Sequence, residues 1–390
     1  MIMKYRKHKG LEISEVGVGT YSLSGVYGSK DIEKFRRMIK RAFKLGANFF
    51  DTAEGYGDAE KILGETVESF REEIIIATKV GIGEGYKPNL SRKYVLKACD
   101  RSLKRLKTDY IDLYQVHFND PVTPIGEVVK TLEELVDMGK IRYYGVGHLP
   151  KEVIKEYCEI GDPFSVLAEF SAVSRESYES LFPLYEKYNL GIIAFSTTGR
   201  GLLTGRFKGK PHFEEGDIRV IDPLFQHERF EYGLKVYGKL AELGRRYGKT
   251  STQVAIAWVL NHPGVICALT GPSTVNHLEE NVGGSGWSIP KEDWQELEAY
   301  LKKEDEWLRK QQKKTMRRIL SNPLRQPQKA FTDLIYVIET AISLNLISEK
   351  QVLPIFYDLY KLKKKIDEKG TELKLREIQT QLRELGFANS

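Results

Sequence analysis

The chain has 390 residues, of which 41% are hydrophobic and 11% aromatic, so it can hold one large domain with an appendage or two domains. Its 60 basic and 54 acidic residues nearly balance, and this argues against the one-sided basic surface of a nucleic-acid-binding protein. The three cysteines form no Cys-x-x-Cys pair, which argues against a disulfide framework and a thiolate metal site. The sequence has no apolar signal segment and no apolar run of about 18 residues, so we expect a cytoplasmic protein without a membrane or nucleic-acid partner.

Short β-rich runs alternate with helical patterns from about residue 11 onward. The strand candidates are 15–20, 47–51, 74–79, 110–117, 141–145, 165–170, 191–196 and 265–270. Eight strand-helix units of about 35 residues predict a (β/α)₈ TIM barrel, an α/β fold, with a doubly wound open sheet as the alternative. Residues 1–14 predict an N-terminal β-hairpin that turns at Lys9-Gly10 and covers the bottom of the barrel.

The composition changes after about Lys302, where charged residues become dense and a Pro-containing linker follows. Three further helical patterns cover 330–346, 348–369 and 372–385. We therefore expect a barrel domain over 1–301, a charged helix and linker over 302–328, and a C-terminal all-α extension over 329–390.

Four polar residues stand at or just after the carboxyl ends of three consecutive strand candidates. They are Asp51 and Tyr56 after the second strand, Lys79 at the end of the third and His117 at the end of the fourth. A single residue of this kind at a strand end is more often a hydrogen-bonded structural group than a catalytic one. Because the carboxyl ends of parallel strands meet at the mouth of a barrel, the four together indicate a reaction centre.

The chemistry that fits this cluster is carbonyl reduction, which needs a proton donor for the developing alkoxide. The Lys79 ammonium would lower the pKa of the Tyr56 phenol, and the Asp51 carboxylate would keep that ammonium charged. His117 would orient the carbonyl or share the proton. Glu54, beside Tyr56, could tune the phenol, but a solvated loop carboxylate is the commoner case.

The segments that carry these residues resemble the aldo-keto reductases. FDTAEGYG (50–57), ATK (77–79) and QVH (115–117) resemble the catalytic signatures, and VGVGT (16–20) resembles the first strand and its cofactor-contacting turn. AFS (194–196) with GRGLLTG (199–205) is similar to the pyrophosphate loop, and GPST (271–274) with LEEN (278–281) to the adenine-ribose segment. The resemblance covers roughly residues 10–300 and is to the bacterial and archaeal branch and the potassium-channel β subunits. It implies a TIM barrel that uses NADPH, less often NADH, without a metal.

Carried over residue by residue, the resemblance makes Asp51, Tyr56, Lys79 and His117 the catalytic tetrad. The implied cofactor contacts are Gly19, Thr20, Tyr21, Asp51, His148, Phe195, Ser196, Thr198, Gly199, Arg200, Gly271, Ser273, Thr274, His277, Glu280 and Asn281. The candidate substrate contacts are Tyr21, Tyr56, Tyr86, His117 and Phe118. Phe195 would stack on the nicotinamide, and Arg200 would add charge at the pyrophosphate unless it forms a surface ion pair instead.

Two places depart from the family pattern. Gly147 and His148 stand where the family usually has Ser-Asn to hold the nicotinamide carboxamide. Gly271, Ser273 and His277 stand where basic residues commonly bind the 2′-phosphate of NADPH. The choice between NADPH and NADH therefore stays open.

The first interpretation is an NAD(P)H-dependent oxidoreductase that reduces an aldehyde or ketone to an alcohol, with Tyr56 as general acid. The alternative is a regulatory cofactor-binding subunit with slow reductase chemistry and a protein partner. It is motivated by residues 302–390, which the family barrel does not need. The same helices could instead join copies of the chain into a homo-oligomer.

Overall fold

The structure is a computed structural model of the chain, and it describes residues 3–27, 31–82, 87–147, 149–214, 216–324, 326–362 and 370–386. Two expected site residues, Tyr86 and His148, lie outside the described residues. The chain divides into two compact units. The first contains Met1–Arg206 and Lys239–Pro290, and the second contains Phe207–Gly238 and Lys291–Ser390.

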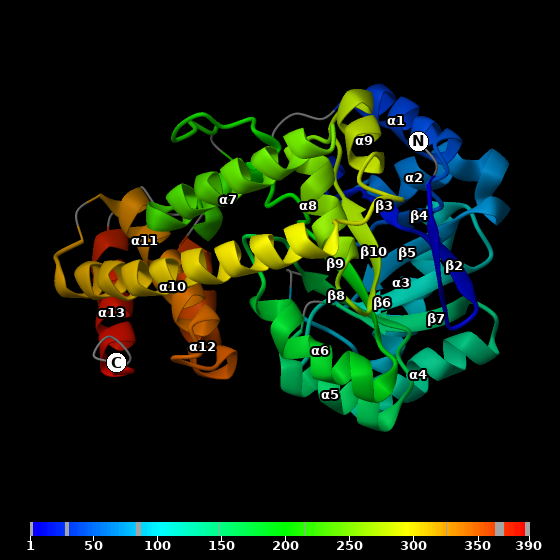
Figure 1. Cartoon of the computed structure of the whole chain (residues 1–390). Helices are drawn as coiled ribbons and strands as arrows, with labels where there is room; N and C mark the ends of the chain where they lie inside the picture. Colours follow the sequence, from blue (N-terminus) through cyan, green and yellow to red (C-terminus); the bar gives the residue numbers. More distant parts are fainter. Residues whose placement is uncertain are drawn as a thin grey trace. The chain divides into compact units, whose positions relative to one another are not determined.

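Eight parallel strands close into a barrel in the first unit (Figure 1). They are β3 (Val16–Gly19), β4 (Phe49–Asp51), β5 (Ile75–Val80), β6 (Ile111–Val116), β7 (Ile141–Val146), β8 (Ser165–Glu169), β9 (Gly191–Phe195) and β10 (Val265–Thr270). Strand β10 pairs with both β3 and β9, so the sheet has no open edge. The predicted TIM barrel is confirmed, and the open doubly wound sheet is excluded.

Helices surround these strands, as Figure 1 shows. They are α1 (Ile32–Lys44), α2 (Ala59–Val67), α3 (Arg92–Leu106), α4 (Ile125–Asp137), α5 (Lys151–Ile160), α6 (Glu176–Tyr188), α8 (Ser251–Leu260) and α9 (Val275–Val282). In α1 the buried residues Phe35, Met38, Ile39 and Ala42 recur at helical spacing, which gives the helix one apolar face. None of the helices in the described ranges combines the length and the apolar character needed to cross a bilayer.

The N-terminal hairpin consists of β1 (Tyr5–His8) and β2 (Leu11–Ser14). Lys9 and Gly10 at its turn have φ of 41° and 87°, the left-handed pair that a tight hairpin turn requires. Leu11 and Ile13 belong to the same buried cluster as Phe49 of the barrel interior. The expectation that the hairpin closes the bottom of the barrel is therefore confirmed.

The interior of the barrel is built in layers because alternate residues of a strand point to the same face. The apolar cluster includes Phe49, Ile75, Ala77, Leu113, Ile193 and Cys267. Asp51 on β4, Lys79 on β5 and Gln115 on β6 each come two residues after a member of this cluster. A polar layer therefore lies directly on an apolar one, at the carboxyl ends of the strands.

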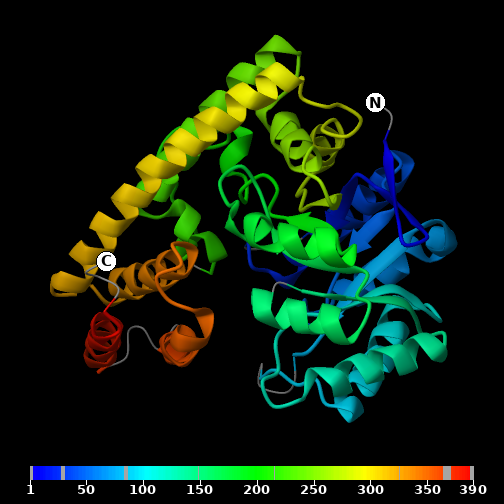
Figure 2. The same ribbon diagram turned by 60° about the horizontal axis from the view of Figure 1, so that its bottom comes forward.

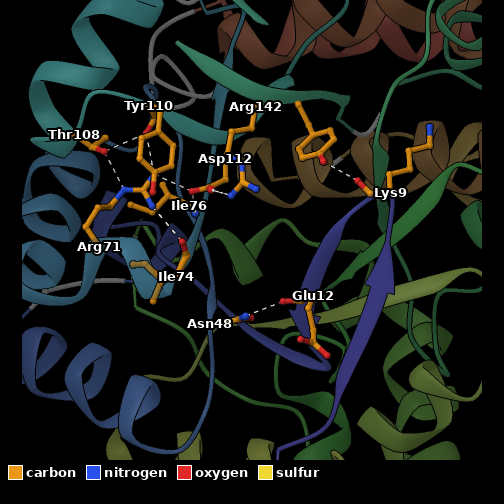
Figure 3. A network of polar contacts seen from close by, with 11 residues as sticks. Lys9, Glu12, Asn48, Arg71, Ile74, Ile76, Thr108, Tyr110, Asp112 and Arg142 are labelled. Atoms are coloured by element: carbon orange, nitrogen blue, oxygen red, sulfur yellow. Dashed lines mark hydrogen bonds and ion pairs between the residues drawn. The ribbon is translucent and has the colours of Figure 1, made fainter. Parts of the chain in front are cut away.

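A second polar network lies at the opposite, amino end of the strands (Figure 3). The Arg71 guanidinium donates to Thr108, to the carbonyls of Ile74 and Tyr110, and to the Asp112 carboxylate at 2.8 Å. Asp112 also accepts hydrogen bonds from the Ile76 amide at 3.0 Å and from Arg142 at 2.9 Å. These contacts tie the starts of β5, β6 and β7 together.

The second unit is helical and has its own apolar core. Its helices are α10 (Lys291–Ser321), α11 (Pro327–Ser343), α12 (Glu349–Leu362) and α13 (Thr371–Glu384), and α7 (His227–Arg246) begins in it. The first turns of α7 lie along α10 (Figure 2). The Tyr232 hydroxyl of α7 donates to Asp305 of α10 at 2.5 Å. The three helical patterns expected after residue 329 correspond to α11, α12 and α13. The boundary expected at residue 302 falls inside α10, because this helix continues without a break from residue 291.

Candidate active site

The centre of the candidate site is a buried ion pair between Lys79 and Asp51. The Lys79 Nζ lies 2.5 Å from Asp51 Oδ1 and donates a second hydrogen bond of 2.8 Å to the Thr52 carbonyl. The other carboxylate oxygen, Asp51 Oδ2, accepts a hydrogen bond of 3.2 Å from Gln115. Burial raises the pKa of Asp51 and lowers the pKa of Lys79, while each charge stabilises the ionised form of its partner.

Tyr56 lies against this ion pair. The Lys79 Nζ is 5.0 Å from the centroid of the Tyr56 ring. The ring centroids of Tyr21 and His117 lie 5.0 Å and 5.8 Å from that of Tyr56, and Phe118 lies 4.4 Å from His117. The structure thus brings together the four expected tetrad residues and two of the expected substrate contacts, Tyr21 and Phe118.

The pKa of Tyr56 shifts in the direction opposite to our expectation. Burial raises the pKa of the phenol well above its usual range, and the negative charge of Asp51 raises it further. The Lys79 ammonium directs its hydrogen bonds to Asp51 and Thr52 and lies over the face of the Tyr56 ring. The phenol therefore stays protonated at neutral pH, which is the state that a proton donor needs.

His117 is a neutral imidazole in this environment. Burial lowers its pKa well below the usual range, and the nearby Lys79 charge lowers it further. Its Nδ1 is buried and has no hydrogen-bond partner among the described residues. A neutral ring with an available nitrogen can hold a polar ligand without carrying a charge itself.

The segment after β9 contains the expected pyrophosphate loop. Ser196 and Arg200 have left-handed φ values of 56° and 52°, and Gly199 and Gly201 have φ of 58° and 92°. Hydrogen bonds within the loop, such as Gly199 N to Ser196 O at 2.7 Å, fold it into tight turns. Phe195 ends β9 and packs against the apolar cluster of the barrel interior.

Arg200 forms the ion pair that we had considered as the alternative to a phosphate contact. Its guanidinium lies 2.7 Å from one oxygen of Glu169 and 3.3 Å from the other. Glu169 is the last residue of β8. A phosphate would therefore have to share Arg200 with this carboxylate.

The expected adenine-ribose segment begins directly after β10. Thr274 caps α9 by accepting a hydrogen bond from the His277 amide at 3.1 Å, and Ser273 Oγ lies 3.0 Å from His277 Nδ1. Gly271 is exposed, and a Cβ at this position would meet no atom within 4 Å. Glu280 is half-buried and Asn281 is buried. Between Gly271 and Asn281 the sequence contains no Lys or Arg.

Known proteins with a similar sequence or structure identify the family. A model described as "Aldo/keto reductase family" matches residues 15–302. The aldo-keto reductase YhdN of Bacillus subtilis (strain 168) is 33% identical over 303 residues, which cover 75% of this chain and 91% of that protein. The chain belongs to the aldo-keto reductase family. Family membership makes it an NAD(P)-dependent oxidoreductase of the bacterial branch.

Solved structures agree with this assignment. The glycerol dehydrogenase AKR11B4 from Gluconobacter oxydans has a TM-score of 0.71 and 29% identity, with 78% of this chain and 97% of that chain covered. The holo form of the aldo-keto reductase AKR11C1 from Bacillus halodurans has a TM-score of 0.66 and 29% identity, with 76% and 96% covered. The family match ends at residue 302, so the last three helices lie beyond it.

The polar atoms of this aldo-keto reductase barrel fit a nicotinamide dinucleotide. Thr20 Oγ1, His117 Nδ1 and Thr197 Oγ1 are buried and have no hydrogen-bond partner within the described part of the chain. Thr20 follows β3, His117 follows β6 and Thr197 follows β9, so all three lie at the carboxyl ends of strands. Buried polar atoms normally find a partner, and these three could pair with polar groups of a ligand.

The two glycines of the VGVGT segment, of which only Gly19 is an expected cofactor contact, have different surroundings. A Cβ at Gly17 would lie 2.8 Å from Cys267 Sγ and 2.9 Å from the Phe49 ring, so this glycine is needed by the crowded barrel interior. A Cβ at Gly19 would make only ordinary contacts, the nearest at 3.6 Å. Of the pair, Gly19 has the room that a cofactor-contacting position needs.

The sequence analysis missed two residues of the site. Gln115 donates a hydrogen bond to Asp51 and pairs in register with Lys79. The sequence clue to it was a polar residue inside an apolar strand, two positions before His117. Thr197 is the buried residue of the loop between Ser196 and Thr198, the two neighbours that we named. No pattern in the sequence distinguishes which of these three consecutive hydroxyl residues is buried.

Proposed function

We propose that the protein reduces an aldehyde or ketone to the alcohol with NAD(P)H, and that Tyr56 donates the proton. When bound, the nicotinamide supplies the hydride to the carbonyl carbon. The Tyr56 phenol gives its proton to the carbonyl oxygen as negative charge develops there. In the oxidative direction the same group would take the proton back.

Each neighbour of Tyr56 has a separate role in this proposal. The Lys79 ammonium stabilises the negative charge that Tyr56 acquires, and Asp51 keeps the ammonium charged and in place. The neutral His117 holds the carbonyl oxygen through a hydrogen bond. Phe195 and Thr20 would hold the nicotinamide end of the cofactor, and the turns at 196–201 its pyrophosphate.

The observation that carries the proposal is the half-buried Tyr56 phenol, whose ring lies 5.0 Å from the buried Lys79 ammonium and 5.8 Å from the His117 imidazole. These three groups come from three different strand ends, so chain connectivity alone does not bring them together. A phenol with a raised pKa is a weak acid in the resting site, and it gains a favourable acceptor only when an alkoxide forms.

The test is the Tyr56→Phe variant. We expect a loss of turnover on the order of 10²–10⁴-fold with any aldehyde that the wild type reduces, because this is the usual contribution of a general acid. Binding of NAD(P)H, measured by fluorescence titration, should stay within about twofold of wild type. The matched control is Tyr114→Phe, which removes another buried hydroxyl that makes no hydrogen bond with described residues. Full turnover in Tyr56→Phe would end the assignment of Tyr56 as the donor.

For the cofactor, we propose that NADH is accepted alongside NADPH. The support is the lack of Lys and Arg between Gly271 and Asn281, where Ser273 and His277 are held by each other. Parallel fluorescence titrations with NADPH and NADH test this proposal. A ratio of dissociation constants above about 100 in favour of NADPH would contradict it.

A regulatory subunit with slow chemistry is the second candidate function. The observation that favours it is the helical unit, whose helices α11–α13 lie beyond the family match. Steady-state rates separate the two candidates, since an enzyme should reach a kcat of about 1 s⁻¹ or more with a suitable carbonyl compound. The homo-oligomer through these helices also stays a prediction, and the mass of the protein in solution tests it.

A further inference from the structure

Glu54 lies in the short segment that joins β4 to Tyr56, and its environment differs from both of our expectations. Its Oε1 accepts hydrogen bonds from the backbone amides of Gly81 at 3.1 Å and Ile82 at 3.3 Å. The same oxygen lies 3.0 Å from the Tyr94 hydroxyl, and Oε2 lies 3.4 Å from Arg101. Glu54 is therefore not a solvated carboxylate, and within the described part of the chain its side chain pairs with Gly81, Ile82, Tyr94 and Arg101.

The two amides that Glu54 binds follow directly after β5, whose last two residues are Lys79 and Val80. The chain leaves the sheet there, and Gly81 has a φ of 124°, a conformation that L side chains rarely adopt. The same turn supports His117, whose amide donates to the Val80 carbonyl at 2.8 Å. Glu54 thus holds the turn that connects to both Lys79 and His117.

The segment before Tyr56 is attached to β5 by its backbone as well. The Thr52 amide donates to the Ala77 carbonyl at 2.8 Å, and the Glu54 amide donates to the Lys79 carbonyl at 3.4 Å. A Cβ at Gly55 would lie only 2.5 Å from Ile82 Cδ1, so this segment and the turn after β5 fit closely. The backbone contacts lengthen toward Tyr56, and the Glu54 side chain makes the last attachment before it.

We propose that Glu54 is a positioning residue for the proton donor. By accepting the Gly81 and Ile82 amides, its carboxylate fixes the Tyr56 segment against the end of β5, and so holds the phenol ring over the Lys79 ammonium. This inference rests on the proposed function, in which Tyr56 donates the proton. It goes beyond the tetrad because Glu54 acts through Tyr56 and touches no reacting atom.

The experiment compares four full-length variants. Glu54→Ala removes the attachment. Glu54→Asp keeps the charge but is one methylene too short to reach both amides, and Glu54→Gln keeps an oxygen that can accept both. Arg101→Ala is the matched control, because it removes only the partly exposed end of the same network. The measurements are kcat, the NAD(P)H dissociation constant, the melting temperature and the pH profile of kcat.

We expect kcat of Glu54→Ala to fall on the order of tenfold to a hundredfold, since small misplacements of a catalytic group have effects of this size. Cofactor affinity should stay within about twofold. Glu54→Gln should recover most of the rate, Glu54→Asp should be intermediate, and Arg101→Ala should match wild type. In Glu54→Ala and Glu54→Asp, the alkaline limb of the kcat profile should move to lower pH, because a displaced phenol is less buried and burial is the largest cause of its raised pKa.

A kcat within twofold of wild type for Glu54→Ala would overturn the proposal. So would a lower kcat and melting temperature with an unmoved alkaline limb, because a purely structural role predicts that pattern. If Glu54→Ala does not fold, Glu54→Asp decides by the same two criteria. Failure of the proposed function has a different signature: the wild type reduces no carbonyl compound, or Tyr56→Phe keeps full turnover.

Discussion

A buried ion pair lies at each end of the barrel strands, and the two pairs differ in how completely hydrogen bonds satisfy their donors and acceptors. At the amino end, Arg71 donates to four groups and Asp112 accepts from three (Figure 3). At the carboxyl end, Lys79 donates to two oxygens, and Asp51 accepts from Lys79 and Gln115. Buried polar atoms around the second pair lack partners among the described residues, including Gln115 Oε1 and His117 Nδ1.

This difference separates a structural ion pair from a functional one. A buried pair is stable only when hydrogen bonds satisfy its remaining donors and acceptors, and the Arg71–Asp112 pair meets that condition. Around the Lys79–Asp51 pair, buried polar atoms lack hydrogen-bond partners among the described residues, and a ligand can bind to them. The number of unmet hydrogen bonds, more than burial or distance, distinguishes these two ion pairs.

The largest effect should come from breaking the pair at the carboxyl end. Lys79→Met should lower turnover on the order of 10²–10⁴-fold, because Tyr56 loses the charge that stabilises its ionised form. It should also reduce the free energy of unfolding by roughly 3–5 kcal/mol, since Asp51 stays buried without its counter-ion. Steady-state kinetics and urea unfolding measure the two effects. Turnover near wild type in a folded Lys79→Met protein would contradict the comparison.

Breaking the pair at the amino end should change stability alone. Arg71→Met should lower the free energy of unfolding by roughly 3–5 kcal/mol, while kcat per folded molecule stays within about twofold. Its control is Arg142→Ala, which removes the more exposed partner of Asp112 and should cost below about 1 kcal/mol. If Arg71→Met instead lowers kcat as Lys79→Met does, the two ends do not differ as proposed.

A half-buried imidazole with aromatic neighbours, His262 in the barrel unit, should make the stability of the protein depend on pH. His262 lies among Phe170, Tyr178 and Trp258, and burial lowers its pKa from 6.5 to about 4. The unfolded chain then binds more protons than the folded one between these values. The contribution of the neutral His262 to the free energy of unfolding is complete above pH 6.5. It is lost as the pH falls toward 4, by about 2–3 kcal/mol in total.

Urea unfolding between pH 4 and 7 measures this loss, with His262→Gln as the comparison protein. The variant lacks the titrating group, so its stability should change less over the same interval. Equal slopes in the two proteins would assign the acid sensitivity to other groups.

The smallest effect should come from the hydrogen bond that supports Asp51. Gln115→Met keeps the side-chain length but removes the 3.2 Å hydrogen bond. We expect a loss of about 1 kcal/mol in stability and a severalfold lower kcat, because the Lys79–Asp51 contact itself is retained. Circular dichroism melts and kinetics with one aldehyde measure both. A loss as large as that of Lys79→Met would place Gln115 in the reaction itself.

The sequence by itself determined the barrel and the meeting of four polar residues from three of its strand ends. Buried parallel strands read as short apolar runs, and alternate residues of a strand share a face, so Asp51, Lys79 and His117 could be assigned to one end of the barrel before any coordinates. Their common mouth follows from the rule that parallel strands end at the same edge. These features depend on local patterns and on the closed topology.

Only the tertiary structure decided which side chains become partners. Glu54 binds amides 27 and 28 residues away, and Arg200 binds Glu169 across 31 residues. The pKa of Tyr56 rises because the fold buries the phenol, and residues 207–238 belong with the C-terminal helices. Such outcomes depend on distances between segments far apart in the chain, and a linear pattern of residue types does not contain those distances.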